Sequence, residues 1–200
     1  MPEIAATRAS LLVRLRNGGD AAAWHEFVRL YAPVIYGFAR KRGLQDADAA
    51  DLMQDVLRSV SSAANRLDYD PKRGTFRGWL FTVTRNKVFN FLDSRKHRVT
   101  GSGDSRVHQR LEQHASNGDG LMDDWQADYE RTLAAQAMQQ VQSEFQPATW
   151  NAFVQTAVEG QTPAQVALSV GLSVGAVYVA KSRVIARLRQ EIEKMQGEDL

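Results

Sequence analysis

Helical periodicity is the feature of this sequence that most constrains its fold. Apolar side chains recur at three- and four-residue spacing, and no stretch keeps the strict alternation that a β-strand requires. The clearest periodic stretches are 24–38, 52–60, 76–91 and 163–187. Turn-forming residues such as those at 68–74 interrupt the periodic stretches. The pattern predicts an all-α protein.

Composition divides the chain into three parts. Residues 100–124 are rich in glycine, serine and aspartate, as is typical of a flexible linker. Residues 100–144 hold eight acidic side chains against three basic ones, whereas residues 1–99 hold seventeen basic against ten acidic. We therefore expect two small helical domains, 1–99 and 125–200, joined by an acidic flexible linker at 100–124. The second domain is expected to end in a helix-turn-helix.

Several classes of site are excluded or disfavoured by composition. The chain has no cysteine, which excludes disulfides and thiolate metal sites, and its four histidines lack ligand spacing with carboxylates. No apolar run approaches the roughly 20 residues needed to span a bilayer, and the N-terminus does not resemble a signal peptide. We expect a cytoplasmic protein with no metal, no cofactor and no membrane insertion. An enzyme is not expected, because Asp51 and Asp55 have no nearby ligand set or phosphate loop.

The segment 163–187 has the residues that a helix-turn-helix requires. Thr162 followed by Pro163 predicts a capped helix start, and Gly171 permits the left-handed conformation of the turn. Ala167 is small enough for two helices to cross there. The predicted inward positions are Val166, Val170, Leu172, Val174, Val177 and Ala180. An ordinary helical hairpin is the alternative interpretation.

The second helix of this segment has a predicted outward face suited to DNA. Its candidate DNA-binding residues are Ser173, Gly175, Ala176, Tyr178, Val179, Lys181, Ser182 and Arg183. Small residues at the helix start allow a close approach to base edges, and the two basic side chains can reach phosphate or guanine. Ser173 can also cap the helix, which leaves backbone N–H groups near a phosphate.

Basic and aromatic residues are combined in residues 71–98, which hold eight basic side chains and one acidic one, Asp93. Cations neutralise phosphates, amides read base edges, and aromatic rings stack on unpaired bases. The candidate DNA-binding residues are Arg73, Arg77, Arg85, Asn86, Lys87 and Asn90. This combination favours single-stranded or melting DNA, whereas a solvated basic face is the alternative. Phe76 and Trp79 are expected in the core rather than in a stacking surface.

An acidic face is predicted on the helix that contains residues 46–60. Asp51, Gln54, Asp55 and Arg58 fall at i, i+3, i+4 and i+7, opposite an apolar stripe. Spacing alone favours a solvated face with an ion pair between Asp55 and Arg58. A protein-docking patch is the alternative.

These segments together resemble the extracytoplasmic-function (ECF) branch of RNA polymerase sigma factors over nearly the whole chain. Residues 21–44 look like the opening helix of the family's first domain, and residues 46–60 are similar to its polymerase-docking helix around a DLxQD core. Residues 75–98 resemble the segment that recognises the minus-ten promoter element. The C-terminal helices resemble the domain that binds the minus-thirty-five element and the polymerase flap.

The resemblance implies a function and a set of contacts. It implies that Asp51, Gln54 and Asp55 contact the clamp helices of core RNA polymerase and that Asn86 lies near a flipped minus-ten base. It also implies that the acidic linker threads through the polymerase. The expected partners are core polymerase and promoter DNA, and the existence of an anti-sigma factor is left open. The alternative function is a free-standing helix-turn-helix regulator that binds duplex DNA without polymerase.

Overall fold

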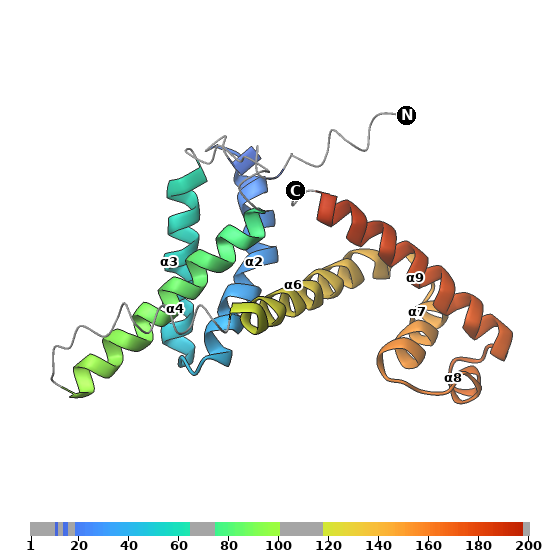
Figure 1. Ribbon diagram of the computed structural model, residues 1–200. Helices are drawn as coiled ribbons and strands as arrows, with labels where there is room; N and C mark the ends of the chain where they lie inside the picture. The colour runs from blue at the N-terminus through green and yellow to red at the C-terminus, as the bar shows by residue number, and fades with distance from the viewer. Residues whose placement is uncertain (1–10, 12–13, 16–18, 65–74, 101–117, 198–200) are drawn as a thin grey trace. The chain divides into compact units, whose positions relative to one another are not determined.

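The computed structural model describes residues 11, 14–15, 19–64, 75–100 and 118–197 (Figure 1). All regular elements of these residues are helical, which confirms the predicted all-α class. They form two compact units: the first contains α2, α3, α4 and the part of α6 up to Thr132, and the second is Leu133–Gln196. Each unit is described by itself.

Helix α2 (Ala21–Lys41) has a side-chain cap at its start and a glycine turn just after its end. The Asp20 side chain accepts a hydrogen bond from the backbone N–H of Ala23 at 2.9 Å, which satisfies one of the unpaired amides of the first turn. At the other end Gly43 adopts φ +87°, a left-handed conformation that glycine reaches without strain. Pro33 lies exposed inside the helix, while Phe27, Ile35 and other apolar residues are buried.

Helix α3 (Asp46–Ala64) packs against α2 and against α4 (Phe76–Thr100), and α4 meets α2 through the ring pairs Phe76 with Phe27 and Phe81 with Phe38. The first turn of α3 carries Asp46 and Asp48, which favour the positive end of the helix dipole. Its buried stripe is Ala49, Leu52, Val56, Val60 and Ala64. An ion pair of 2.9 Å between Arg95 and Asp48 links α4 to the first turn of α3.

The buried face of α4 differs in part from the stripe that its apolar spacing predicts, which is Phe76, Leu80, Val83 and Phe91. Phe76 and Leu80 are buried, whereas Val83 and Phe91 are only half-buried. The other buried side chains of α4 are Phe81, Thr84 and Val88. Thr84 occupies an apolar position because its hydroxyl donates to the Leu80 carbonyl at 2.8 Å, so no polar group is left unpaired.

Helix α6 (Gly118–Val141) begins inside the range predicted as linker. Trp125, which we expected to open the second domain, is fully buried in the first unit between Phe38 and Phe81, with ring centroids 5.5 and 5.8 Å away. The boundary between the units thus lies after Thr132 rather than at 124/125. The assignment of functions to 1–99, 100–124 and 125–200 stays a prediction, and residues 101–117 lie outside the described part.

The second unit contains α7 (Pro147–Phe153), a π-helical turn η3 (Val154–Val158), α8 (Pro163–Val170) and α9 (Val174–Gly197), after the short 3₁₀ turn η2 (Gln142–Glu144). One cluster of its core joins α6, α7 and α9 through Ala137, Val141, Trp150, Phe153, Val184 and Leu188. A second cluster joins α7, α8 and α9 through Ala152, Val166, Ala167, Val177 and Ala180.

Taken singly, none of the described helices has both the length and the apolar character needed to cross a membrane. Among the described helices, only the pair Pro163–Val170 and Val174–Gln196 has that length and apolar character when the two helices are taken together, and this pair is bent by 96°.

Candidate nucleic-acid and protein interfaces

The predicted docking face lies on α3 and points away from the core. Asp51, Gln54 and Asp55 are all exposed, on the side opposite the buried stripe. The expected pair between Asp55 and Arg58 is present, with a carboxylate–guanidinium distance of 2.7 Å. Both of its side chains are largely exposed, so the pair contributes little to stability.

An open hollow of about 610 Å³ lies between α3 and α4 and reaches Asp55 at the edge of this face. Its lining residues are Asp55, Arg58, Ser59, Ser62, Ala63, Trp79 and Lys87. Trp79, expected in the core, is half-buried, with one side toward Phe76 at a centroid distance of 5.6 Å. The hollow therefore brings Asp55, predicted to bind protein, and Lys87, predicted to bind DNA, to one opening.

The start of α4 positions the candidate DNA-binding residues. The Thr75 hydroxyl accepts a hydrogen bond from the Gly78 amide at 3.1 Å and caps the helix. From this start, Thr82, Asn86 and Asn90 follow at four-residue spacing, and all three are exposed. They form an exposed stripe of hydroxyl and amide groups, which can donate to and accept from base edges.

The candidate DNA-binding arginines and lysine of α4 are less exposed than this stripe of hydroxyl and amide groups. Arg77, Arg85 and Lys87 are half-buried, and the Arg85 Nε has no hydrogen-bond partner among the described residues. Arg73 lies outside the described residues. The structure thus brings Asn86 and Asn90 onto one exposed face, with Arg85 and Lys87 beside them in sequence and less accessible.

The helix-turn-helix has the local geometry that its sequence predicts. Thr162 and Gln165 form a reciprocal capping box at the start of α8, and Gly171 adopts φ +70° in the turn. The Ser173 hydroxyl then accepts from the Ala176 amide at 3.2 Å, as expected for the cap of α9. The two helices meet through Ala167, Val177 and Ala180 of the buried cluster.

One predicted inward residue of this segment is misplaced. Val174 is 44% exposed, whereas Val166, Val177 and Ala180 are buried. The buried stripe of α9 runs through Val177, Ala180, Val184 and Leu188. At about 100° per residue, Val174 lies roughly 80° from the centre of that stripe, so it falls at its edge.

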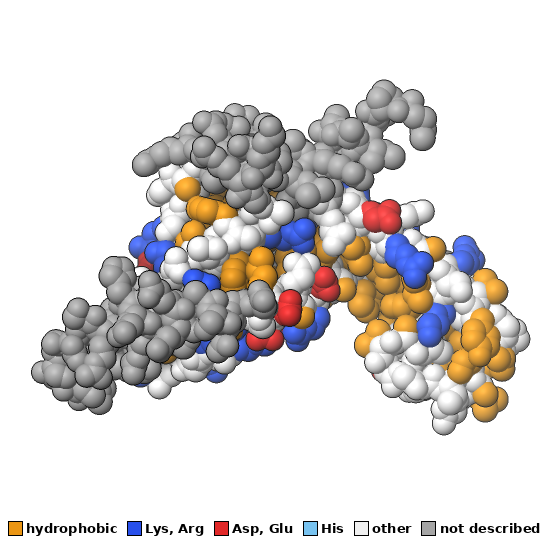
Figure 2. Space-filling model, viewed as in Figure 1, with side chains coloured by type: hydrophobic (Ala, Val, Ile, Leu, Met, Phe, Trp, Pro, Cys, Tyr) orange, Lys and Arg blue, Asp and Glu red, His pale blue; other side chains and the backbone are white. Residues whose placement is uncertain are grey.

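The outward face of α9 is accessible. Ser173, Gly175, Tyr178, Val179, Ser182 and Arg183 are exposed, and Ala176 and Lys181 are half-buried. Figure 2 shows hydrophobic side chains gathered over α8 and the start of α9, where the large exposed residues are Leu168, Val174, Tyr178 and Val179. Exposed apolar groups on a helix otherwise lined by small residues suit contact with thymine methyl groups.

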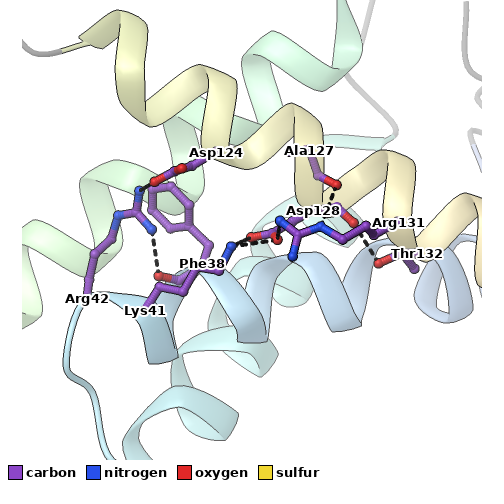
Figure 3. Close-up of polar contacts among 8 residues, drawn as sticks. All are labelled: Phe38, Lys41, Arg42, Asp124, Ala127, Asp128, Arg131 and Thr132. Carbon is purple, nitrogen blue, oxygen red and sulfur yellow. Dashed lines mark hydrogen bonds and ion pairs between the residues drawn. The ribbon is translucent and has the colours of Figure 1, made fainter. Parts of the chain in front are cut away.

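Sequence reasoning missed the contacts that the first half of α6 makes with the end of α2 (Figure 3). The Asp128 carboxylate pairs with Lys41 at 2.7 Å and with Arg131 at 2.8 Å, and Asp124 pairs with Arg42 at 3.5 Å. Burial lowers the pKa of Arg42, whose guanidinium lies 3.4 Å from the Phe38 ring centroid. The spacing of Trp125 and Tyr129 signals a buried face, but not its partner.

Among the described residues, no group of three or more histidine or acidic side chains lies close enough together to hold a metal ion. What the described surfaces offer is an exposed acidic patch, an amide-bearing helix and a helix-turn-helix. These are groups that bind by hydrogen bonding and charge.

Comparison with known proteins connects the first two of these surfaces. Residues 27–98 match the family model for Sigma-70 region 2. That range includes the acidic face of α3 and every candidate residue of α4. The helix-turn-helix lies outside it.

Curated relatives extend the match along the chain. The ECF RNA polymerase sigma factor RpoE of Cereibacter sphaeroides is 32% identical over 83 residues, which are 42% of this chain and 45% of that protein. The ECF RNA polymerase sigma factor SigE of Mycolicibacterium smegmatis is 28% identical over 184 residues, or 90% of this chain and 66% of that protein. The RNA polymerase sigma factor CnrH of Cupriavidus metallidurans is 27% identical over 186 residues, or 89% of this chain and 91% of that protein.

A solved structure of CnrH in complex with the cytosolic domain of CnrY is 24% identical, with 92% of this chain and 96% of that chain covered at a TM-score of 0.35. On these matches the chain is similar to ECF RNA polymerase sigma factors over most of its length, and its residues 27–98 match Sigma-70 region 2.

Proposed function

We propose that the protein binds core RNA polymerase and directs it to specific promoters as a non-enzymatic initiation factor. The observation that carries this proposal is the pairing of two surfaces within residues 27–98. The exposed acidic face of α3 and the exposed amide stripe of α4 lie on adjacent helices of one unit. A factor that only binds duplex DNA needs neither of them.

In this proposal α3 docks on the polymerase. Asp51, Gln54 and Asp55 contact the clamp helices of the largest subunit, because a carboxylate–amide–carboxylate face is suited to basic and amide side chains of a partner. The open position of all three supports this role, since no neighbouring helix covers them. Docking would require Asp55 to exchange its exposed pair with Arg58 at little cost in free energy.

In the same proposal α4 recognises the minus-ten element as it melts. Asn86 lies near an extruded base, with Asn90 next along the stripe and Arg77, Arg85 and Lys87 toward phosphates. Extrusion of a base costs a few kcal/mol, so phosphate contacts and the binding energy of the polymerase must offset it. Arg73 is assigned to the same element from its sequence alone.

The helix-turn-helix of the second unit is assigned to the minus-thirty-five element. Ser173, Gly175 and Ala176 at the start of α9 allow a close approach to base edges, and the larger Tyr178 and Val179 follow on the exposed face. Lys181, Ser182 and Arg183 are assigned to phosphates and to guanine. The same unit is proposed to contact the polymerase flap, and the described residues do not bear on that contact.

An anti-sigma factor is a further proposed partner. The solved relative CnrH is described in complex with the cytosolic domain of CnrY. The exposed apolar residues over α8 and α9 are a surface that such a protein partner could cover.

A direct test compares holoenzyme formation by the wild type and two variants. Asp51→Ala/Gln54→Ala/Asp55→Ala should abolish co-elution with core polymerase while the circular dichroism spectrum stays unchanged, because all three side chains are exposed. Asp123→Ala, an exposed acid on α6, is the matched control and should co-elute normally. Unchanged polymerase affinity of the folded triple variant would remove α3 from the interface.

A free-standing regulator is the alternative, favoured by the complete helix-turn-helix of the second unit. It predicts salt-sensitive binding to duplex DNA by the protein alone and no co-elution with polymerase.

A further inference from the structure

The guanidinium of Arg77 lies over the ring of Tyr129, 4.8 Å from its centroid. Arg77 stands in the first turn of α4, whereas Tyr129 comes from α6, on the far side of the predicted linker. Tyr129 is fully buried and Arg77 is half-exposed. The arginine therefore covers the tyrosine ring and still reaches solvent.

Tyr129 is held in place from several directions. Its ring stacks on Tyr31 at 5.7 Å, and Tyr31 meets Phe76, the residue before Arg77, edge-on at 5.9 Å. One turn earlier Trp125 is buried, and the Asp128 carboxylate pairs with Lys41 at 2.7 Å. The ring under Arg77 is thus a rigid platform.

Met122 brings the same helix close to the beginning of α4. A Cβ atom at Gly78 would lie 3.9 Å from the Met122 Cε and 3.3 Å from the Thr75 hydroxyl that caps α4. The first turn of α4, which carries Arg77, is therefore packed against α6 at two points, Gly78 and Arg77.

The contact with the Tyr129 ring orients the Arg77 guanidinium without neutralising its charge. A guanidinium stacked on an aromatic face keeps its charge and its N–H edge, and both remain able to meet a phosphate. A carboxylate partner would compete with that phosphate. The nearby Asp128 is instead engaged by Lys41 and Arg131.

We infer that Tyr129 is a positioning residue for promoter binding: it holds the guanidinium of Arg77 in the orientation that meets a minus-ten phosphate. The inference rests on the proposed function and adds to it a residue from outside the region-2 match. The inference adds the first half of α6 to the surface that is proposed to bind the minus-ten element.

The test measures the dissociation constant of the holoenzyme for a promoter probe with a single-stranded minus-ten element. Tyr129→Phe keeps the ring and should change binding less than about twofold, whereas Tyr129→Leu keeps an apolar side chain but removes the ring face. We expect Tyr129→Leu to weaken binding about two- to fivefold, the range that an exposed cation–π contact supports. Tyr36→Leu, at a tyrosine whose hydroxyl instead donates to Asp46 at 3.1 Å, is the matched control and should bind as the wild type does.

A double-mutant cycle separates positioning from a structural role. Arg77→Gln should weaken binding and reduce the salt dependence by about one phosphate contact. In the Arg77→Gln background, Tyr129→Leu should have no further effect. Arg77→Lys, which keeps the charge at a half-exposed position without the planar group, should weaken binding as Tyr129→Leu does. This variant tests the inference even if Tyr129→Leu fails to fold.

Three results would overturn the inference. Additive losses from Tyr129→Leu and Arg77→Gln would make Tyr129 merely structural. An unchanged dissociation constant for Arg77→Gln in a holoenzyme that binds promoters would remove Arg77 from the interface and leave the proposed function standing. Failure of the wild type to bind core polymerase would overturn the proposed function, and the inference with it.

Discussion

Trp125 provides the strongest single test of the packing of α6 on the first unit. It is fully buried, with Phe38 of α2 and Phe81 of α4 at 5.5 and 5.8 Å. Trp125→Ala should therefore lower the free energy of local unfolding of α2 and α4, although Trp125 follows the predicted linker in the sequence. If residues 118–132 belonged only to the second unit, the substitution would leave both helices unaffected.

The magnitude follows from buried area and one unpaired group. A buried tryptophan withdraws about 250 Å² from water, which at about 25 cal/mol/Å² is roughly 6 kcal/mol. The Trp125 Nε1 is buried without a hydrogen-bond partner among the described residues, which offsets about 1–3 kcal/mol. The net loss for Trp125→Ala is then about 3–5 kcal/mol, in line with other tryptophan-to-alanine changes. Trp125→Phe removes the unpaired N–H as well as some area, so it should cost less than about 1.5 kcal/mol.

Hydrogen exchange read by mass spectrometry is the suitable assay, because it reports each helix separately. Trp125→Ala should lower the protection free energy of peptides from α2 and α4 by about 3–5 kcal/mol and leave α8 peptides unchanged. Asp123→Ala, exposed on the same helix, should change protection by less than about 0.5 kcal/mol. A loss below about 1 kcal/mol in α2 and α4, or an equal loss in α8, would refute the reasoning.

Three further predictions concern a turn between helices, a helix cap and a pair of ion pairs. Gly171→Ala should cost about 1–2 kcal/mol in the second unit, measured by exchange in α8, because the turn needs φ +70°; no loss would contradict that requirement. Hydrogen bonds from Arg14 and from the Ala23 amide hold the pKa of Asp20 below its usual value. The wild type should thus be more stable than Asp20→Ala above about pH 4 and lose that advantage as the pH falls through the folded pKa, whereas a pH-independent difference in melting temperature would argue against it. Arg187 bridges Glu144 at 2.7 Å and the buried Glu191 at 2.9 Å, so Arg187→Met should lower the melting temperature of the second unit more than Glu144→Gln does, and equal effects would contradict a role for the buried acid.

The helix-turn-helix could be predicted from sequence because its determinants are local. A capping pair at Thr162 and Gln165 and the left-handed Gly171 each act within a few residues, and each is present in the structure. The acidic face of α3 was equally accessible to prediction, since exposure followed from the position of its apolar stripe.

The partner of α6 could not be predicted, because it depends on contacts between residues far apart in sequence. The spacing of Trp125 and Tyr129 shows that a face is buried, and it is equally compatible with either unit. Ion pairs such as Lys41 with Asp128 join residues 87 positions apart. The sequence-based division placed Asp124 at the end of the acidic linker and Asp128 in the second domain, and it gave neither acid a partner in the first unit. Val174 was mispredicted for a smaller reason, its place at the edge of the α9 stripe.

The central claim is that this chain gives promoter specificity to core RNA polymerase. The most direct measurement is run-off transcription by purified core polymerase on genomic promoter fragments, with and without the protein. We expect discrete transcripts only when the protein is present, with starts downstream of shared minus-ten and minus-thirty-five elements, and none with the Asp51→Ala/Gln54→Ala/Asp55→Ala variant. Binding to duplex DNA without any protein-dependent transcript would contradict the claim and favour a free-standing regulator.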